Sequence, residues 1–176
     1  LNNIYESYQE IASFYCVRSF IAGKSTACEI LFQKEKDYIV MESDLIWNKI
    51  YDTPEDNYRQ YRSIWMRMSA NIAQIGKPVV LCGCGIPEQF ENLPERELFT
   101  KIHYIAVVSD SDIFEKRMRE GRNVTDDGWI KSSLHFNDWL KKNAEKTTPT
   151  ISLVDNSHLT PEETAERIDS YSILSF

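Results

Sequence analysis

Ala22-Gly23-Lys24-Ser25-Thr26 is the stretch of this chain that decides the fold. It follows an apolar run over 11–17 and opens a helical pattern over 24–33. Glycine lets backbone N–H groups approach a phosphate, lysine reaches the terminal phosphates of a nucleotide, and a serine hydroxyl can hold Mg²⁺. The N-terminus of the following helix adds partial positive charge beneath those phosphates. The sequence therefore predicts a nucleotide site formed by these five residues, with Lys24 on the phosphates and Ser25 as the metal ligand.

The first half of this loop departs from the usual spacing. In the pattern G-x-x-x-x-G-K-[ST] the first glycine stands five residues before the second, and that position is Arg18 here. A residue other than glycine must avoid positive φ there or accept strain. Two interpretations therefore stay open: a loop that binds a nucleotide and transfers its phosphate, and a loop that binds without catalysing transfer.

The composition is that of one globular domain. The 176 residues are 42% hydrophobic and 27% charged, which suits a chain with a substantial core. The net charge of −7 argues against a protein that coats nucleic acid or an anionic membrane. The sequence contains no apolar run of membrane-spanning length and no signal-peptide pattern. We expect a single domain over 1–176, located in the cytoplasm.

The four cysteines are expected to be structural. They lie in or beside apolar runs, at Cys16, Cys28, Cys82 and Cys84, and form no C-x-x-C pair. The three histidines are scattered along the chain, so both spacing and clustering are wrong for zinc. We expect buried, reduced thiols of an intracellular protein.

Apolar runs suited to strands alternate with helical patterns along the chain. Strands are expected at 11–17, 38–41, 79–82, 102–108 and 149–154. Helices are expected at 24–33, 53–76, 87–98, 109–120, 126–142 and 160–171. This alternation predicts an α/β fold with a parallel five-stranded sheet and helices on both faces. Ligands of such sheets bind beyond the carboxyl ends of the strands.

The longest expected helix is predicted to begin at Thr53. Thr53 is a suitable cap, Pro54 suits the first helical position, and two acids follow in the first turn. Apolar side chains then recur at helical spacing. They include Tyr58, Tyr61 and Trp65, which we expect to form a buried stripe rather than a substrate platform.

Asp44 is the candidate for the acceptor side of the site. It follows the second expected strand, so its carboxylate should lie on the same side of the sheet as Lys24. A carboxylate there can accept a proton from an attacking hydroxyl or orient that hydroxyl. The alternative role is a helix cap, which Ser43 also suits, and Glu42 is the fallback carboxylate.

A cluster of arginines is the candidate for a lid. Arg117, Arg119 and Arg122 stand close together in an otherwise acidic chain. Phosphoryl transfer needs cations over the β- and γ-phosphates, and the turn at 121–123 suits a segment that closes, near 117–128. Arg122 is predicted to be catalytic and Arg117 to bind the nucleotide. The alternative is a solvated helical face.

The ends of two further expected strands bear on the binding of the nucleotide base and of Mg²⁺. Asp155-Asn156 follows the last expected strand, where Asn156 can contact a base, although both residue types are also common in turns. The third expected strand closes on 82–85 without an acidic residue. Mg²⁺ would therefore depend on Ser25, phosphates, water and Asp44.

These features together resemble the P-loop kinases of the nucleoside and nucleotide kinase-like group, which include shikimate, gluconate and chloramphenicol phosphotransferases. The resemblance covers nearly the whole chain and extends over 81–90 to uncharacterised bacterial ATPase-like members. It rests on the segments 23–26, Asp44, 117–122 and 154–156. It implies a three-layer αβα fold with a five-stranded parallel sheet in the order 2-3-1-4-5, and ATP with Mg²⁺ as cofactors.

Three functions are compatible with this resemblance, in decreasing order of preference. The first is an ATP-dependent kinase for a hydroxyl of a nucleoside, a sugar acid or a similar small molecule, bound by the segment 45–75. The second is a regulatory or catalytically impaired nucleotide-binding protein. The third is a polynucleotide 5′-kinase, against which the acidic balance and the lack of a basic stripe count. The expected partners are a nucleotide and a small acceptor, with no membrane or nucleic acid, and a homo-oligomer stays open.

Overall fold

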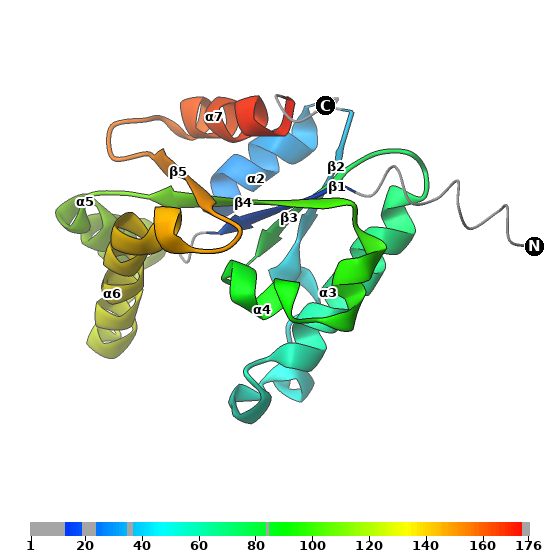
Figure 1. Cartoon of the computed structure of the whole chain (residues 1–176). Coiled ribbons are helices and arrows are strands. Elements are labelled where there is room, and N and C mark those ends of the chain that lie inside the picture. The colour runs from blue at the N-terminus through cyan, green and yellow to red at the C-terminus, as the bar shows by residue number, and fades with distance from the viewer. Residues whose placement is uncertain (1–12, 19–23, 35–36, 84, 174–176) are drawn as a thin grey trace, which may run out of the picture.

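The computed structural model describes residues 13–18, 24–34, 37–83 and 85–173; at 13–18, 24–25 and 172–173 the description covers the backbone (Figure 1). Five strands form one sheet in the order β2-β3-β1-β4-β5, and every neighbouring pair is parallel. The strands are β1 (Ser13–Arg18), β2 (Ile39–Glu42), β3 (Val79–Gly83), β4 (Lys101–Val108) and β5 (Ile151–Asp155). In the central register, Val17 lies opposite Cys82 on one side and Ile105 on the other.

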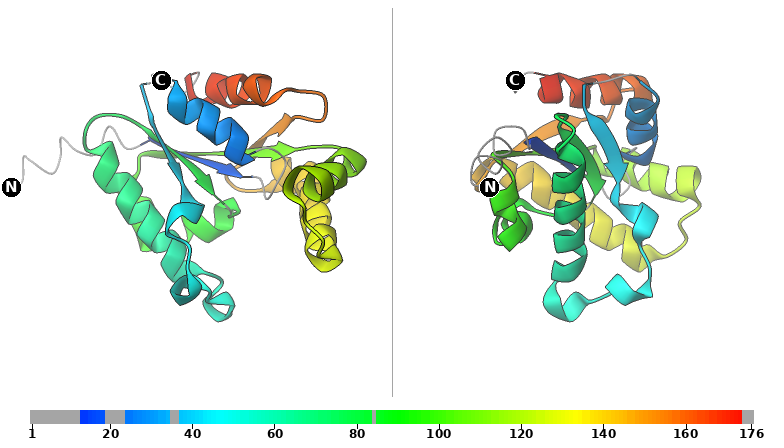
Figure 2. Two further views of the ribbon diagram at one scale, coloured as in Figure 1. Left: turned by 180° about the vertical axis from the view of Figure 1, so that it is seen from behind. Right: turned by 90° about the vertical axis from the view of Figure 1, so that its right-hand side faces the viewer.

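Helices cover both faces of this sheet. They are α2 (Lys24–Gln33), α3 (Arg59–Ala73), α4 (Pro87–Glu91), α5 (Ser111–Lys116), α6 (Asp127–Asn143) and α7 (Pro161–Ile173). Helices α2 and α7 lie side by side on one face, while α3 and α4 lie on the other (Figures 1 and 2). None of the helices in the described ranges is long and apolar enough to cross a membrane.

Side-chain alternation along the buried strands divides the core into two clusters. In β3, Val79 and Leu81 face the cluster under α3 and α4, whereas Val80 and Cys82 face the cluster under α2 and α7. A strand covered on both faces reads as a continuous apolar run, which is the pattern of 79–82. Helix α6 contributes to both clusters, with Ile130 in one and Leu140 in the other. The expected three-layer αβα class is confirmed.

The expectation of reduced thiols is wrong for two of the cysteines. Cys28 of α2 and Cys82 of β3 form a disulfide across a sequence separation of 54 residues, with their Cα atoms 6.6 Å apart. Both residues are buried in the same core cluster. The pairing arises because α2 packs on the face to which every second side chain of β3 points. Neither the apolar surroundings nor the spacing of the two cysteines signals that contact in the sequence.

The predicted start of the long helix at Thr53 is also wrong. Pro54–Asp56 forms a separate 3₁₀ helix, and α3 begins at Arg59. Between them, Asn57 and Tyr58 have φ values of 55° and 56°, so the chain reverses before α3 starts. The side-chain hydroxyl of Thr53 donates to Asp56, at 2.7 Å, instead of capping the longer helix.

Candidate functional site

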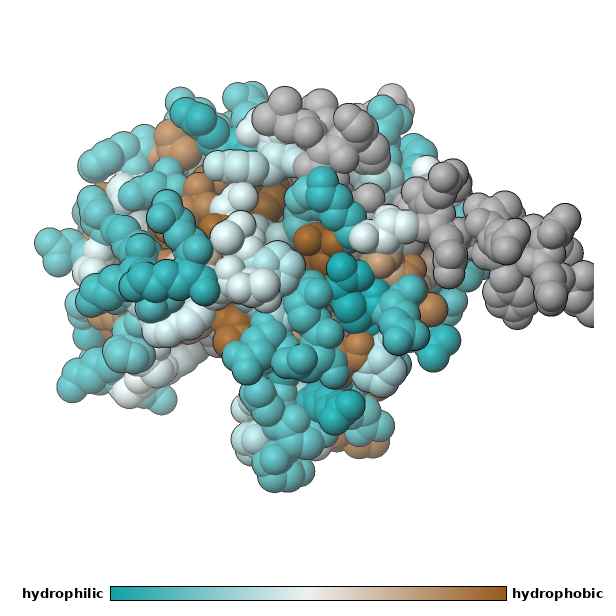
Figure 3. All heavy atoms as spheres, in the orientation of Figure 1, coloured by the Kyte–Doolittle hydropathy of each residue, from teal (hydrophilic) through white to brown (hydrophobic). Residues whose placement is uncertain are grey.

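The carboxyl ends of the parallel strands lie along one edge of the sheet. Helix α2 is the next described element after the central strand β1 and begins at this edge. The outline of the molecule is indented between the part that carries α6 and the projecting end formed by α3 and residues 43–58 (Figure 3). The strands end at Arg18, Glu42, Gly83, Val108 and Asp155.

The predicted phosphate loop falls mostly outside the described residues. Ala22 and Gly23 lie there, whereas Lys24 and Ser25 form the first turn of α2 and Thr26 follows as an exposed residue. The helix thus begins at the lysine of the motif, as the prediction for 24–33 requires. An N-terminus at this edge is suited to an anion, because its first N–H groups have no partner within the helix.

Arg18 is the last residue of β1. Its backbone continues the parallel ladder opposite Gly83 and Ala106. Extended strand backbone is open to any residue, so the strain expected for a non-glycine residue at this position does not arise. The departure from the usual motif therefore falls at the end of a strand.

Asp44 is held at the edge by contacts to its neighbours. Ser43 and Asp44 open a 3₁₀ helix (Ser43–Ile46) immediately after β2, and the Asp44 side chain is exposed. The buried Ser43 hydroxyl donates to Asp44 Oδ1 at 3.2 Å, and the Ser43 carbonyl accepts a hydrogen bond from the Tyr61 hydroxyl. Glu42 occupies the cap position of this helix, without a side-chain capping bond. The geometry thus presents the Asp44 carboxylate at the strand ends.

Gly83 allows Ser43 to lie close to the end of β3. A Cβ atom at Gly83 would lie 3.0 Å from Ser43 Oγ, which is closer than nearly all real contacts of that kind. Gly83 therefore lets the chain leaving β2 pass close to the end of β3. The segment 82–85 stands out in the sequence for its small residues, and the structure gives one of them a packing role.

Aromatic rings line the segment after Asp44. Trp47 meets Tyr61 edge-on, with ring centroids 5.1 Å apart, and Tyr58 at 6.0 Å. Tyr61 also contacts Tyr51 and the buried Trp65. The expected buried stripe is confirmed for Tyr61 and Trp65, whereas Tyr58 is only half-buried. The rings extend from the core to the surface beside the candidate acceptor position.

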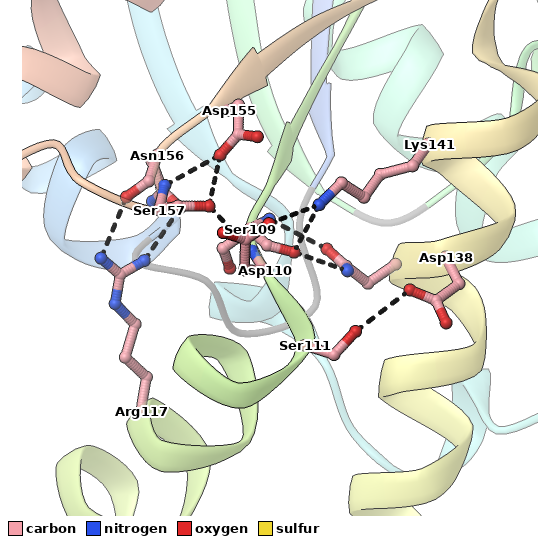
Figure 4. A network of polar contacts seen from close by, with 10 residues as sticks. Ser109, Asp110, Ser111, Arg117, Asp138, Lys141, Asp155, Asn156 and Ser157 are labelled. Atoms are coloured by element: carbon pink, nitrogen blue, oxygen red, sulfur yellow. Dashed lines mark hydrogen bonds and ion pairs between the residues drawn. The ribbon is translucent and has the colours of Figure 1, made fainter.

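Arg117 and Asn156 are brought together on the opposite side of β1. The guanidinium of Arg117 donates from Nη1 to Asn156 Oδ1, at 2.9 Å, and from Nη2 to the Asn156 carbonyl, at 3.0 Å (Figure 4). Asn156 is buried, and its N–H donates to Val108 O at the end of β4. Arg117 and Asn156, which are 39 positions apart in the chain, therefore lie in direct contact. The sequence predicted a nucleotide contact for each of them separately.

Asp155 is fixed by Ser157 at the end of β5. The Ser157 hydroxyl donates to Asp155 Oδ1 at 2.6 Å, and its N–H donates to the same atom at 2.9 Å. Burial by itself raises the pKa of Asp155, but these hydrogen bonds, with the nearby charges of Lys141 and His158, outweigh it and leave the pKa below its ordinary value. Asp155 is thus an anion at this edge.

The same network continues to β4 and α6 through residues for which the sequence predicts no role. The Asp110 N–H donates to Ser157 Oγ at 2.8 Å, and Lys141 forms an ion pair with Asp110 at 3.0 Å. Asn137 exchanges two hydrogen bonds with the backbone of Ser109, at 2.9 and 3.1 Å. The one available signal was Asn137, a polar residue on the buried side of an amphipathic helix.

The arginine cluster divides between two roles. Arg119 pairs with Glu115 and Asp127, at 2.8 Å each, so it lies on a solvated helical face. Arg122 is exposed and follows the π-helix Arg117–Gly121. This segment is anchored at two buried side chains, Met118 and Val124, whose backbones are joined by a hydrogen bond of 3.1 Å. Arg122 therefore lies on a short stretch of chain between two buried anchors.

The described residues contain no group of three or more histidine, cysteine, aspartate or glutamate side chains placed to hold a metal ion. The expectation that zinc is absent was made from the sequence and stays a prediction. For Mg²⁺, the only predicted carboxylate ligand at the edge is Asp44, which is exposed there. That arrangement suits a cation that keeps several waters and phosphate oxygens as ligands.

The fold is similar to that of several solved structures of low sequence identity, kinases among them. A sugar kinase from Janibacter is 13% identical, with 94% of this chain and 96% of that one covered, at a TM-score of 0.61. The tunicamycin resistance protein of Deinococcus radiodurans is 12% identical, with 92% and 95% covered, at 0.58. A gluconokinase from Sinorhizobium meliloti is 15% identical, with 96% and 99% covered, at 0.56. No protein-family description and no curated protein sequence matches the chain.

Proposed function

We propose that this protein is an ATP-dependent phosphotransferase acting on a hydroxyl of a small molecule. One observation carries the proposal: the candidate acceptor carboxylate, Asp44, and the Arg117–Asn156 pair follow strands on opposite sides of β1, at the same edge of the sheet. Helix α2, which opens with Lys24, begins between them. The fold shared with kinases of small molecules supports the same function.

Each residue then has a role that fits its position. The loop 22–26 would cradle the phosphates, and Lys24 would stabilise the charge that develops on the terminal one. Asp44 would orient the acceptor hydroxyl and take its proton. Arg117, held by Asn156, would border the base, and Arg122 would reach the phosphates when the segment 117–128 closes.

The residues present are compatible with Mg²⁺. Ser25 stands where the motif places its metal ligand, and Asp44 is an exposed carboxylate at the same edge. When bound, Mg²⁺ neutralises phosphate charge. We propose one catalytic domain over 1–176, with a nucleotide and a small acceptor as its ligands. We propose the cytoplasm as its location, where a disulfide such as Cys28–Cys82 is an exception to the usual reduced state of thiols.

A nucleotide-binding protein without transfer activity is the second candidate. It is favoured by the chain's departure from the motif at Arg18 and by the absence of an acidic residue within 82–85. It predicts ATP binding without acceptor-dependent ADP release. A polynucleotide 5′-kinase is the third candidate, and the net charge of −7 disfavours it.

The decisive experiment compares Asp44→Asn with the wild type in ADP release across a panel of nucleosides, sugar acids, alcohols and 5′-hydroxyl oligonucleotides. We expect one acceptor class to be turned over, and Asp44→Asn to lower kcat by about 10²–10⁴-fold because the hydroxyl loses its base. Asp52→Asn is the matched control, since Asp52 is an exposed aspartate of the same segment.

The Lys24→Ala variant distinguishes phosphate transfer at the proposed site from ATP hydrolysis by a contaminating enzyme. It should abolish turnover, since the lysine contacts the phosphates that move. Full activity of Asp44→Asn would show that the acceptor role is misassigned. ATP binding without turnover of any acceptor would favour the second candidate, and the absence of ATP binding would refute both.

A further inference from the structure

Large apolar side chains are exposed in the residues that follow Asp44. Leu45 is 79% exposed, Ile50 71% and Trp47 46%. All three lie on the 3₁₀ helices Ser43–Ile46 and Lys49–Tyr51 or between them, next to the candidate acceptor carboxylate. We call Leu45, Trp47 and Ile50 the apolar rim. The three residues lie within six positions of one another in the chain, and large apolar side chains exposed close together mark a surface that becomes covered.

The apolar rim rests on a fixed base. Trp47 packs edge-on against Tyr61, at an interplanar angle of 88°, and Tyr61 is buried in the core under α3. The Tyr61 hydroxyl in turn bonds to the carbonyl of Ser43, the residue before Asp44. Tyr61 therefore contacts both the Trp47 ring of the apolar rim and the backbone of the residue next to the Asp44 carboxylate.

The charge of this segment does not favour an anionic ligand. Residues 43–58 carry four carboxylates, at Asp44, Asp52, Glu55 and Asp56, against one ammonium group, at Lys49. Arg59, the first residue of α3, follows this segment and is exposed, whereas Arg62 is buried, donates to the carbonyl of Asn57 and lies over the Tyr58 ring at 5.8 Å. With Arg59 counted, the four carboxylates still outnumber the cationic side chains by two. A carboxylate-bearing acceptor would meet like charge here, so a neutral one fits better.

We propose, on the basis of the phosphotransferase function above, that the acceptor is a neutral alcohol with an aromatic or otherwise apolar body. Its hydroxyl meets Asp44 and its apolar part covers the apolar rim. The alcohol oxygen forms a bond to the γ-phosphorus of ATP while the bond to the β–γ bridging oxygen breaks. ADP leaves with that electron pair, and the hydroxyl proton passes to Asp44 and then to water. The products are a phosphate monoester, ADP and one proton.

The test compares tryptophol, a neutral aromatic alcohol, with gluconate, an anionic polyol. We expect calorimetric binding of tryptophol and ATP-dependent ADP release, with kcat/KM at least about tenfold above that for gluconate. The double variant Leu45→Ser/Ile50→Ser should weaken tryptophol binding about tenfold or more, because each side chain loses apolar area covered by the ligand. Phe32→Ser and Ile75→Ser are matched controls, since those side chains are 68% and 66% exposed elsewhere.

ATP binding, measured by calorimetry in every variant, separates this proposal from the function on which it rests. If ATP binds and gluconate is preferred, or if the double variant binds tryptophol as the wild type does, the substrate class is wrong and the kinase function stands. Absence of tryptophol binding also overturns the proposal. A dimer that the double variant dissociates, seen by sedimentation, would show that a second copy covers the apolar rim instead.

Discussion

Arg117 is held by both the side chain and the backbone of a single residue, Asn156. Two parallel N–H···O bonds fix the plane of a guanidinium as well as its position. A lysine carries the same charge but cannot make this pair of contacts. Orientation of Arg117 at the edge of the sheet therefore depends on Asn156, which is itself buried and bonded to the end of β4.

Replacement of Arg117 by lysine should raise the Kd for ATP about tenfold or more. The variant keeps the positive charge but loses the two bonds to Asn156 that orient the side chain at residue 117, so the proposed contact with the nucleotide is weakened. Hydrogen bonds of charged groups contribute about 1.5–3 kcal/mol. Calorimetric titration with ATP and Mg²⁺ measures the change. Arg119→Lys is the control, with an expected change below about twofold, because Arg119 makes only exposed ion pairs. Equal effects of the two substitutions would contradict the assignment.

The ionisation of Asp155 makes the free energy of unfolding depend on pH in the acidic range. Its folded-state pKa lies below the ordinary value, so the ionised form stabilises the folded state above the unfolded pKa of about 4. This contribution is lost as the pH falls through the folded-state pKa. The difference in free energy of unfolding between wild type and Asp155→Asn should therefore be largest near pH 7 and shrink below about pH 4.

Urea denaturation at pH 7, 5 and 3.5 measures that difference. Ser157→Ala removes the hydroxyl that donates to Asp155 at 2.6 Å, so it should raise the pKa of Asp155 and weaken the pH dependence. A difference between wild type and Asp155→Asn that stays constant over this range would contradict the account.

The positions of single residues at the edge of the sheet were predictable where a strand end marks them, while their roles stay predictions. Asp44 and Asn156 follow apolar runs, and polar residues at such places stand out in the sequence. The pairing of Arg117 with Asn156 was not predictable, because it depends on how α5 sits against the turn after β5. Ser157 and Lys141 were missed since serine and lysine carry no positional signal of their own.

At the scale of elements, the helices set by local signals were predicted well and the start of α3 was not. Helix α2 has the bounds expected from the sequence, and Thr160 and Glu163 form reciprocal capping bonds at the start of α7, where a helix was expected. Before α3, the local signals at Thr53 and Pro54 are satisfied by a short 3₁₀ helix instead. The left-handed backbone at Asn57 and Tyr58 separates this short helix from α3, and the cap and proline at 53–54 do not signal that break.

Gly85 sets the path from β3 into α4. A Cβ atom there would collide with the ring of Phe90, a buried residue of α4. Gly85→Ala should therefore lower the free energy of unfolding by about 1–3 kcal/mol, as overpacking does. Gly121→Ala is the control, because a Cβ atom at Gly121 would meet nothing within 4 Å. Equal stability of both variants in urea denaturation would contradict the close approach.

For the molecule as a whole, the order of apolar runs and helical patterns was enough to predict the layers. Buried parallel strands require cover on both faces, so alternation along the chain implies three layers. The covalent link between two of those layers was not predictable. Two cysteines 54 positions apart meet only because α2 and β3 belong to the same core cluster, and the alternative of free thiols suited their surroundings equally well.

The disulfide should contribute to the stability of the entire fold. A link between Cys28 and Cys82 restricts the unfolded chain, and the loop-entropy estimate for this separation is about 4 kcal/mol. Reductant should lower the free energy of unfolding by up to this amount. The variant Cys28→Ala/Cys82→Ala should not respond to reductant. A thiol count of four in unreduced, denatured protein would contradict the disulfide and support the reduced state expected of a cytoplasmic protein.

Helix α6 is attached near its middle. Asn137 fastens it to Ser109 at the end of β4, and its first turn adjoins the segment 117–128 while Lys141 near its far end holds Asp110. Ile130 and Leu140, on either side of Asn137, are buried in the two core clusters, so the helix is held along its length. Detaching α6 would therefore disrupt apolar packing on both faces of the sheet as well as the polar network at the strand ends.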